Sequence, residues 1–407
     1  MVQIAPFKAV RYNADQISKS SDVIAPPYDV IREPEHKRLL KRHPNNIVRV
    51  ELPAAAETQD RYAVAAEIWK RWQEKGVLTP DSEPAFYGYE QRFSAGGKKY
   101  VRRGFFAALF LETPGVGHVR PHERTFPKHK EDRLHLMRAT HANISPIFGI
   151  FMDRKRKAQA LLARRMRQKP TVSAKGDKGV KHRLWRWSDA EAIKILTGAL
   201  RAEDVLIADG HHRYETAWNY AQERGGLPGA YSGQDAYRYV MTFLCPLEDH
   251  GLVIQPTHRL VRWQAPWDEW KKQIEQSFVI QPIAGLQKMI SRLQSPREKT
   301  SLGLVFEGGK LFWLKARSRA VALPVVPLHE EILKDVPLEK ISYLQDPKEV
   351  AQSVRNGQAN AAFLLPPPDK DAFARLCKAG QRLPQKSTYF YPKLATGFVM
   401  RSLDGEA

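Results

Sequence analysis

The sequence predicts an α/β (α+β) protein built on a mixed sheet. Short apolar runs rich in β-branched and aromatic residues alternate with stretches of helical periodicity, which favours this class. The apolar fraction of 43% is enough for a buried core. The length of 407 residues predicts several segments or one large elaborated unit. Only two cysteines occur, so we expect neither a disulfide framework nor a thiolate zinc site.

The N-terminal segment, residues 1–150, is expected to contain strands, helices and a hairpin. SDVIAPPYDVI and HPNNIVRVELP are β-branched runs bounded by Pro and Asn, which is typical of strands that end in loops. Residues 58–76 have helical periodicity and end at a glycine, and residues 84–112 read as a hairpin around SAGGKK. Residues 131–142 could form a helix, and SPIFGIF is typical of a buried strand.

The central segment, residues 151–265, repeats a strand–helix–strand pattern. DRKRKAQALLARRMRQKP predicts a solvated helix, and KGDKGVKH predicts a loop. The helix DAEAIKILTGAL, the strand DVLIAD and the helix HHRYETAWNYAQERGG follow, and two further strands complete the pattern. A third segment, residues 266–407, adds another helix with strands, unless the three segments form one continuous unit.

The net charge of +21 is concentrated in one part of the chain. Thirteen Lys or Arg and two acids lie between Asp153 and Arg186, so this stretch carries +11. The basic segment, residues 154–186, is either a solvated surface that aids solubility or a patch for phosphate or nucleic acid. Aromatic residues for base stacking are missing from most of it, which favours the first interpretation and makes a nucleic-acid partner a weaker prediction.

No apolar run is long enough to cross a bilayer, and MVQIAPFKAVRYN lacks a signal-peptide core. We therefore expect a cytoplasmic protein that does not associate with membranes.

The stretch VLIADGHHRYETA, residues 205–217, carries the strongest chemical signal. A strand that ends at a glycine and opens a helix exposes unpaired N–H groups to an anion, and Gly210 allows a ligand close to the backbone. Arg213 can bind phosphate oxygens with two hydrogen bonds, and of His211 and His212 one could face the ligand. Asp209 could cap the helix, hold Mg²⁺ or orient a histidine. The structural alternative is a plain Asp-Gly turn with a surface His–Glu pair.

The stretch IADGHHRYETA is similar to the DGHHR box of the ParB/sulfiredoxin-like superfamily, which includes ParB N-terminal domains, sulfiredoxin and free-serine kinases. Over the whole chain, the sequence resembles the family called domain of unknown function 1015. The stretches that carry this resemblance are APPYDVI (25–31), HPNNIVRVELP (43–53), RPHERTFPKHKEDRLHLMRATHANISPIFG (120–149), IADGHHRYETA (207–217), YVMTFLCPLEDHGLVIQPTHRLV (239–261) and LPQKSTYFYPKLATGFVM (383–400).

The resemblance implies a ParB/sulfiredoxin-like core and a nucleotide-phosphate site at Asp209, Gly210, His211, His212 and Arg213. Free-serine kinases also use a glutamate from earlier in the chain as the base on the substrate hydroxyl. Glu51 and Glu123 are both candidates for that role. The implied cofactors are Mg²⁺ and a nucleoside di- or triphosphate, and the implied substrate is a small hydroxyl metabolite, with free serine as the first choice.

Other residues could complete the site. Two prolines could hold Asp29 in an extended backbone next to the substrate. Arg49 and Glu51 would share one side of a strand, either as an outward ion pair or as an inward pair at the substrate.

Further candidates lie in two polar stretches. Arg120, His122 and Glu123, together with Lys128 and Arg133, could reach a phosphate or carboxylate from a loop. A histidine metal cluster there is the less favoured interpretation. Lys386, Ser387 and Thr388 could bind a phosphate, although no GxxxxG precedes them.

Three functions remain open at this point. The first is a small-molecule kinase in which Asp209, His211, His212, Glu51 or Glu123 take catalytic roles. The second is a nucleotide-binding regulator of ParB type that binds DNA through the basic segment without kinase activity. The third is a phosphatase that uses His211 or His212.

Overall fold

The computed structural model describes residues 1–54, 60–123, 127–225, 235–318 and 323–404. Contacts within the chain group it into two compact units. Unit 1 comprises Met1–Pro121, Thr125–Val253 and Pro392–Ala407, and unit 2 comprises His122–Arg124 and Ile254–Tyr391. The division into segments 1–150, 151–265 and 266–407 stays a prediction.

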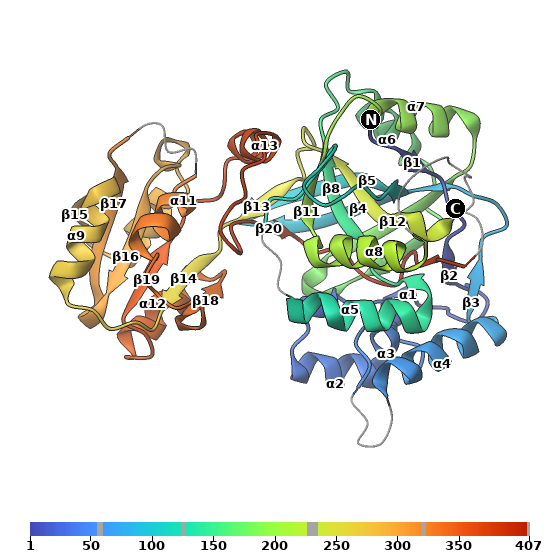
Figure 1. Ribbon diagram of the computed structural model, residues 1–407, viewed down its shortest axis with the longest axis horizontal. Coiled ribbons are helices and arrows are strands. Elements are labelled where there is room, and N and C mark those ends of the chain that lie inside the picture. Colours follow the sequence, from blue (N-terminus) through green and yellow to red (C-terminus); the bar gives the residue numbers. More distant parts are fainter. Residues whose placement is uncertain (55–59, 124–126, 226–234, 319–322, 405–407) are drawn as a thin grey trace. The chain divides into compact units, whose positions relative to one another are not determined.

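A nine-stranded mixed sheet forms the centre of unit 1, which confirms the predicted α/β class (Figure 1). β12 runs parallel to β8 and β11 runs parallel to β6, whereas the other neighbouring strands are antiparallel. In spatial order the strands are β6 (Val119–Arg120), β11 (Val205–Asp209), β8 (Ile147–Phe151), β12 (Tyr239–Pro246), β5 (Lys98–Phe110), β4 (Phe86–Ala95), β10 (Lys181–Trp187) and β9 (Val172–Lys175), and β1 (Ile4–Ala5) also pairs with β5. Two small ladders join β2 (Val10–Tyr12) to β3 (Leu78–Pro80), and β7 (Ala142–Asn143) to β21 (Arg401–Ser402).

Helices of unit 1 stack in successive layers from the sheet outward. α8 contacts β8 and β12, α5 packs on α8, and α4 packs on α5 (Figure 1). The described helices of unit 1 are α1 (Ser20–Val23), α2 (Glu33–Arg42), α3 (Val48–Glu51), α4 (Arg61–Glu74), α5 (Pro127–Thr140), α6 (Lys157–Arg165), α7 (Ala190–Leu200) and α8 (His211–Glu223). Asp60 and Asp189 cap α4 and α7 with their side chains, which explains where these two helices begin.

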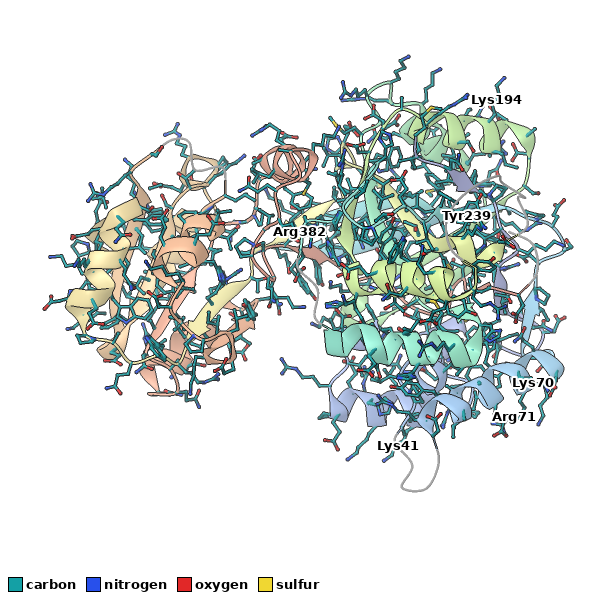
Figure 2. All side chains as sticks on the ribbon, viewed as in Figure 1. Lys41, Lys70, Arg71, Lys194, Tyr239 and Arg382 are labelled. Carbon is teal, nitrogen blue, oxygen red and sulfur yellow. The ribbon has the colours of Figure 1, made fainter. Side chains whose placement is uncertain are left out.

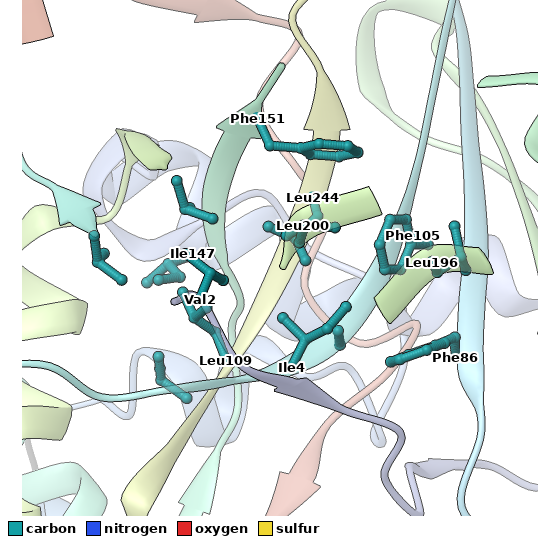
Figure 3. Packing of buried hydrophobic residues seen from close by; sticks show 14 of the residues in the cluster. Val2, Ile4, Phe86, Phe105, Leu109, Ile147, Phe151, Leu196, Leu200 and Leu244 are labelled. Carbon is teal, nitrogen blue, oxygen red and sulfur yellow. The ribbon is translucent and has the colours of Figure 1, made fainter. Parts of the chain in front are cut away.

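The main core of unit 1 lies between this sheet and α6, α7 and α8 (Figure 3). Phe105 and Leu109 project from β5, while Leu196 and Leu200 project from α7, and all four are fully buried. Burying a side chain of this size stabilises the fold by about 1.5–3 kcal/mol. This packing fixes β8, β11 and α8, which carry the residues described below.

Most local predictions are confirmed. The hairpin at 84–112 is β4 and β5, the helix expected at 58–76 is α4, and SPIFGIF contains β8. The first two residues of that expected helix lie outside the described part of the chain. The DVLIAD strand and the helix that follows are β11 and α8. These elements have strong periodicity and clear end signals in the sequence.

Three local predictions are wrong. SDVIAPPYDVI contains α1 and a 3-10 turn at Tyr28–Val30, and HPNNIVRVELP contains α3, in place of strands. The side chain of Asn46 donates to the carbonyls of Asp22 and Ile24 and accepts from the N–H of Val48, so local bonds replace a strand ladder. KGDKGVKH is not one loop, because its last two residues begin β10.

Unit 2 contains a six-stranded antiparallel sheet with helices of its own. The strand order is β15 (Phe278–Pro282), β17 (Lys310–Ala316), β16 (Leu302–Phe306), β19 (Ala361–Leu364), β14 (His258–Val261) and β18 (Ile341–Leu344). A separate ladder joins β13 (Val253–Gln255) to β20 (Tyr389–Tyr391). The described helices are α9 (Trp267–Ser277), α10 (Leu286–Leu293), α11 (Val325–Pro327), α12 (Pro347–Arg355) and α13 (Lys370–Lys378).

Much of the positive charge lies on exposed helix faces. Lys41 on α2, Lys70 and Arg71 on α4, and Lys194 on α7 are exposed and extend away from their helices (Figure 2). Among the described residues, no helix is both long and apolar enough to span a bilayer.

Candidate functional site

The DGHHR stretch forms a tight strand-to-helix turn. β11 ends at Asp209, Gly210 adopts the left-handed conformation with φ of 89°, and α8 begins at His211. A Cβ atom on Gly210 would lie 3.1 Å from the guanidinium carbon of Arg213 and 3.0 Å from Ile147. Glycine is therefore required both by the backbone angle and by the close approach of the Arg213 side chain.

Asp209 is the last residue of β11 and directly precedes Gly210, the N-cap residue of α8. Its Oδ2 accepts a hydrogen bond of 2.9 Å from Nη2 of Arg213, and its Oδ1 accepts one from Nζ of Lys393. Arg213 also donates to the carbonyl of Pro146. The carboxylate is thus held between two cations, and Arg213 is fixed at both ends of its guanidinium.

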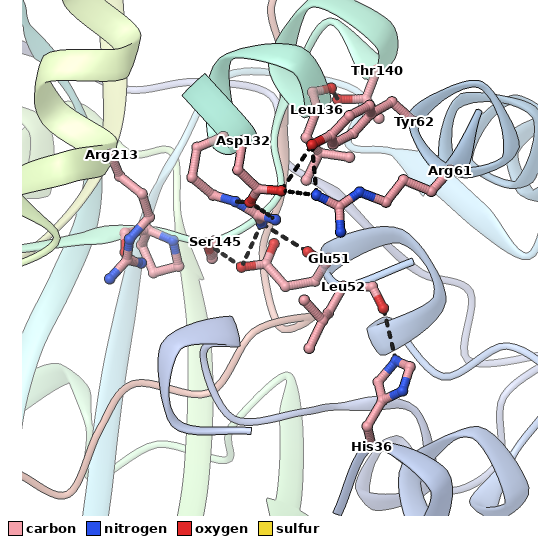
Figure 4. A network of polar contacts seen from close by, with 12 residues as sticks. His36, Glu51, Leu52, Arg61, Tyr62, Asp132, Leu136, Thr140, Ser145 and Arg213 are labelled. Carbon is pink, nitrogen blue, oxygen red and sulfur yellow. Dashed lines mark hydrogen bonds and ion pairs between the residues drawn. The ribbon is translucent and has the colours of Figure 1, made fainter. Parts of the chain in front are cut away.

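Glu51 is buried in the same unit, with 1% of its surface exposed. It lies at the end of α3, so the expected strand that would have placed Arg49 beside it does not form. Oε1 of Glu51 accepts a hydrogen bond of 2.8 Å from the hydroxyl of Ser145 (Figure 4). Burial raises the pKa of Glu51, and the positive charge of Arg133 opposes that rise. A carboxyl with a raised pKa is suited to accept a proton.

Arg133 connects Glu51 to its neighbours. Its Nη1 donates to the backbone carbonyl of Glu51 at 2.7 Å and lies 3.9 Å from the Glu51 carboxylate. Its guanidinium also pairs with Asp132 and lies 4.1 Å from the centre of the Tyr28 ring. Burial raises the pKa of Tyr28 to about 12, so its hydroxyl stays protonated at neutral pH.

Several carboxylates act on Arg213. Burial lowers the pKa of this guanidinium, but Asp209, Asp29 and Glu51 raise it overall. Asp29 itself is exposed. The structure therefore brings Asp29, Glu51, Asp209 and Arg213 into one electrostatic group.

A small cavity of about 30 Å³ lies next to Glu51 and Arg213. It is lined by Glu51, Arg133, Ser145, Arg213 and Thr216, with apolar neighbours from α5 and β12. One or two water molecules fit in this volume, and a nucleotide does not. Polar groups that converge on a small wet cavity can position a hydroxyl and move its proton.

The two histidines differ in exposure. His211 is buried, with 5% of its surface exposed, and His212 is partly exposed in the first turn of α8. The surface His–Glu pair offered as the structural alternative is incompatible with the burial of His211.

Five other predicted residues belong to unit 2 and gather there. Nε2 of His122 lies 3.0 Å from the hydroxyl of Thr388, and the Glu123 carboxylate accepts a hydrogen bond of 3.1 Å from the N–H of Lys386. Ser387 donates to the carbonyl of Pro384. The sequence suggested both stretches, HERT and QKST, but did not predict their pairing.

Arg49 and Arg120 have contacts of other kinds. Nη2 of Arg49 donates to the carbonyl of Leu40 at 2.8 Å, and Nε of Arg120 lies 3.5 Å from the carboxylate of Asp204. Neither contact involves the group around Glu51 and Arg213.

Sequence reasoning missed Lys393 entirely. This residue lies in YPKLATG, within one of the stretches that carry the family resemblance, but Lys386 was chosen because two hydroxyl residues follow it. Arg133 was proposed as a phosphate ligand from a loop, and it instead lies on α5.

The described residues contain no group of three or more His, Cys, Asp or Glu side chains arranged to hold a metal ion. Asp209, the predicted magnesium ligand, has one oxygen on Arg213 and the other on Lys393. Two cations therefore already balance the charge that a metal would neutralise.

Comparison with known proteins gives one family match. A family model described as "Protein of unknown function (DUF1015)" matches residues 4–337. No curated protein matches the chain.

Solved structures show distant likenesses. A conserved hypothetical protein from Pyrococcus furiosus is 13% identical with a TM-score of 0.36, covering 69% of this chain and 92% of that one. A free serine kinase in complex with AMP is 13% identical with a TM-score of 0.38, covering 69% and 89%. SbnI with a C-terminal truncation, from Staphylococcus aureus, is 10% identical with a TM-score of 0.39, covering 72% and 86%. These values assign no ligand and no residue role to this chain.

Proposed function

The chain belongs to the family described as Protein of unknown function (DUF1015), and we propose that it is a nucleotide-dependent phosphotransferase that acts on the hydroxyl of a small metabolite. The observation that carries this proposal is the buried Glu51 carboxylate, which shares a small cavity with Arg133 and Arg213. A base with a raised pKa and two phosphate-binding cations are what phosphoryl transfer needs from a protein.

In this proposal the Gly210 turn binds the phosphates. The first N–H groups of α8 and the charge of Arg213 would attract an anion, and His212 in the first turn would add a further polar contact. Asp209 and Lys393 hold Arg213 in position rather than reacting themselves. Because the cavity is too small for a nucleotide, the nucleotide would bind outside it and present only its terminal phosphate.

The transfer step needs no reactant other than the substrate, the nucleotide and the Glu51 carboxylate. The substrate hydroxyl gives its proton to the Glu51 carboxylate while its oxygen forms a bond to the terminal phosphorus. The bond from that phosphorus to the bridging oxygen breaks, and the shortened nucleotide leaves with the electron pair. Arg133 and Arg213 would stabilise the charge that develops on the phosphoryl oxygens.

Magnesium fits this site only together with the nucleotide. Mg²⁺ bound to phosphates needs one or two protein carboxylates, and its remaining ligands are phosphate oxygens and water. Asp29 is the exposed carboxylate of the group, whereas Asp209 would first have to release Lys393. Asp29 is therefore the better candidate to hold a metal–nucleotide complex. When bound, the ion would neutralise phosphate charge.

The first experiment incubates the purified chain with Mg²⁺ and ATP, ADP or CTP in turn, with and without L-serine. Thermal stability reports binding, and phosphorus NMR detects a new phosphomonoester. We expect one nucleotide to raise the melting temperature and to transfer its phosphate. A stability rise without any product would instead favour the nucleotide-binding regulator, and no rise with any nucleotide would refute the proposal.

Glu51→Gln tests the proton acceptor. The rate should fall by about 100- to 10,000-fold, because the amide cannot take the proton. In the wild type, the rate should rise with pH through the raised pKa of Glu51, since only the ionised form accepts a proton. Glu112→Gln is the matched control, since Glu112 is a carboxylate of the same unit that accepts from the N–H of Val119. Equal losses in both variants would assign Glu51 a structural role only.

A further inference from the structure

A second polar pocket of unit 1 lies outside the group around Glu51. It has a volume of about 370 Å³ and is bounded by β4, β5 and β10 and by the end of α6. Four of its lining side chains are arginines, namely Arg92, Arg103, Arg167 and Arg183. Glu90 is the carboxylate among its lining residues. The pocket therefore holds a formal charge of +3 when all five groups are ionised.

The sheet register builds this arrangement. Arg103 and Arg183 lie directly opposite Glu90 on the two neighbouring strands, and Arg92 follows Glu90 by two residues. Residues opposite one another, and residues two apart on a strand, share one face of a sheet. Three arginines are thus presented by paired strands rather than by loops, which limits their freedom to move apart.

Glu90 orients these three guanidinium groups. It is buried, with 1% of its surface exposed, and its Oε1 accepts from Nε of Arg92 at 2.7 Å and from Arg183. Its Oε2 accepts from Nε of Arg103 at 3.0 Å. A guanidinium has five N–H donors, so Arg92 and Arg103, which use Nε for Glu90, keep their terminal nitrogens for another acceptor.

The chemistry of the lining selects a class of ligand. The Trp185 ring lies under the Arg183 guanidinium, 5.1 Å from its carbon, so it supports the arginine instead of offering a face to a base. The lining residues include no aromatic side chain, and stacking platforms are what single-stranded nucleic acids require. The planar guanidinium group of an arginine can donate two hydrogen bonds to the oxygens of one phosphate.

We propose that this pocket binds a small oligophosphate, a chain of two or three phosphate groups that is either free or part of a nucleotide. Three unbalanced positive charges offset most of the negative charge of such a ligand, and the volume of about 370 Å³ accommodates it. The inference does not depend on phosphotransfer at Glu51, because the two groups of residues share no member.

The test titrates the full chain with inorganic tripolyphosphate by calorimetry. The double variant Arg92→Glu/Arg167→Glu changes two partly or fully exposed arginines of the pocket and leaves Arg103 and Arg183 on Glu90. The matched control Arg164→Glu/Arg201→Glu makes the same change of charge at two exposed arginines that do not line the pocket. We expect affinity to fall at least about tenfold for each arginine removed from the pocket, and by much less in the control.

Two further measurements distinguish a free phosphate chain from a nucleotide, and this pocket from the group around Glu51. ATP that binds no more tightly than tripolyphosphate would identify the phosphate chain as the ligand, whereas tighter binding of ATP would show that a nucleoside is also recognised. Arg213→Met should remove a binding event at the Glu51 group and leave the tripolyphosphate event of the pocket unchanged. Transfer activity is followed in all variants, so failure of either proposal is visible separately.

Three results would overturn the inference. One is the absence of tripolyphosphate binding in the wild type, which would leave Glu90 as a clamp between three strands. Another is equal loss in the pocket variant and the control, which would mean diffuse attraction to a basic surface. The last is tighter binding of a single-stranded oligonucleotide with a steep salt dependence, which would favour a nucleic-acid surface.

Discussion

Arg213 in unit 1 and Arg259 in unit 2 are both buried, but their surroundings differ in charge. Arg213 faces Asp209, Asp29 and Glu51, and these carboxylates raise its pKa despite burial. Burial lowers the pKa of Arg259 to about 10. Its donors are taken by the carbonyls of Thr257 and Gln385 and by Nε2 of His329. Two buried arginines of this chain therefore differ in the direction in which their surroundings shift the pKa. Three carboxylates act on Arg213, whereas the hydrogen bonds of Arg259 go to neutral acceptors and Glu123 acts on it through its charge.

The largest expected effect comes from removing the charge of Arg213. Arg213→Met should lower the free energy of unfolding of unit 1 by about 3–5 kcal/mol, because Asp209 and the carbonyl of Pro146 lose a hydrogen-bond donor and Glu51 loses a nearby positive charge. Under the proposed function, in which Arg213 holds the transferring group, it should also weaken transition-state binding by roughly 2–4 kcal/mol. Hydrogen exchange in urea, resolved for the strands of each unit, measures the stability, and phosphorus NMR measures the transfer.

Arg259→Met is the counterpart and should change the stability of unit 2 by no more than about 1 kcal/mol. The carbonyls that lose a donor cost about 1–3 kcal/mol. Removal of a charge that burial disfavours returns a similar amount, since the pKa of Arg259 is lowered from 12.5 to about 10. Transfer activity should stay at the wild-type level. Equal destabilisation by the two substitutions would remove the distinction between the sites.

The sequence predicted the parts of the site that depend on neighbouring residues. The turn from β11 into α8 follows from an apolar run, a glycine and a helical pattern in direct succession. The contact of Asp209 with Lys393 joins residues 184 positions apart, so no local pattern reports it. Glu51 was selected as an acid earlier in the chain, and its role stays a prediction, but the element predicted for it was wrong. The expected strand there gave way to α3 because Asn46 bonds to the local backbone.

His329 accepts a hydrogen bond from Arg259, and its surroundings predict that the stability of unit 2 depends on pH. Burial first, and then the charge of Arg259, lower the pKa of His329 from 6.5 to about 3. An unfolded histidine takes up a proton as pH falls below its usual pKa, whereas the folded one does not, so stability is lost from about pH 6.5 downward.

Between pH 7.5 and pH 5, this one group should cost unit 2 up to about 2 kcal/mol. His329→Gln keeps an acceptor for Arg259 and cannot be protonated, so its unit 2 should lose less stability over the same range. Hydrogen exchange of β14 and β19 at both pH values gives the comparison. His118→Gln is the control, since His118 is exposed and pairs with Asp204 in unit 1. An unchanged pH dependence in His329→Gln would show that His329 does not set it.

The last prediction concerns the position of Arg213 relative to Asp209. Gly210→Ala forces a side chain into a left-handed residue and brings its Cβ to 3.1 Å from the Arg213 guanidinium. The substitution should destabilise unit 1 by about 1–2 kcal/mol, and it should also shift Arg213 relative to Asp209.

Gly198→Ala makes the same change within α7, where no atom lies within 4 Å of the new Cβ. Alanine is the better helix former, so this control should stabilise the unit by about 0.5–1 kcal/mol. Opposite signs in the thermal midpoints, with activity lost only in Gly210→Ala, would tie the glycine to the position of Arg213. Equal activity in both variants would mean that Arg213 tolerates displacement, and the contrast with Arg259 would then rest on charge alone.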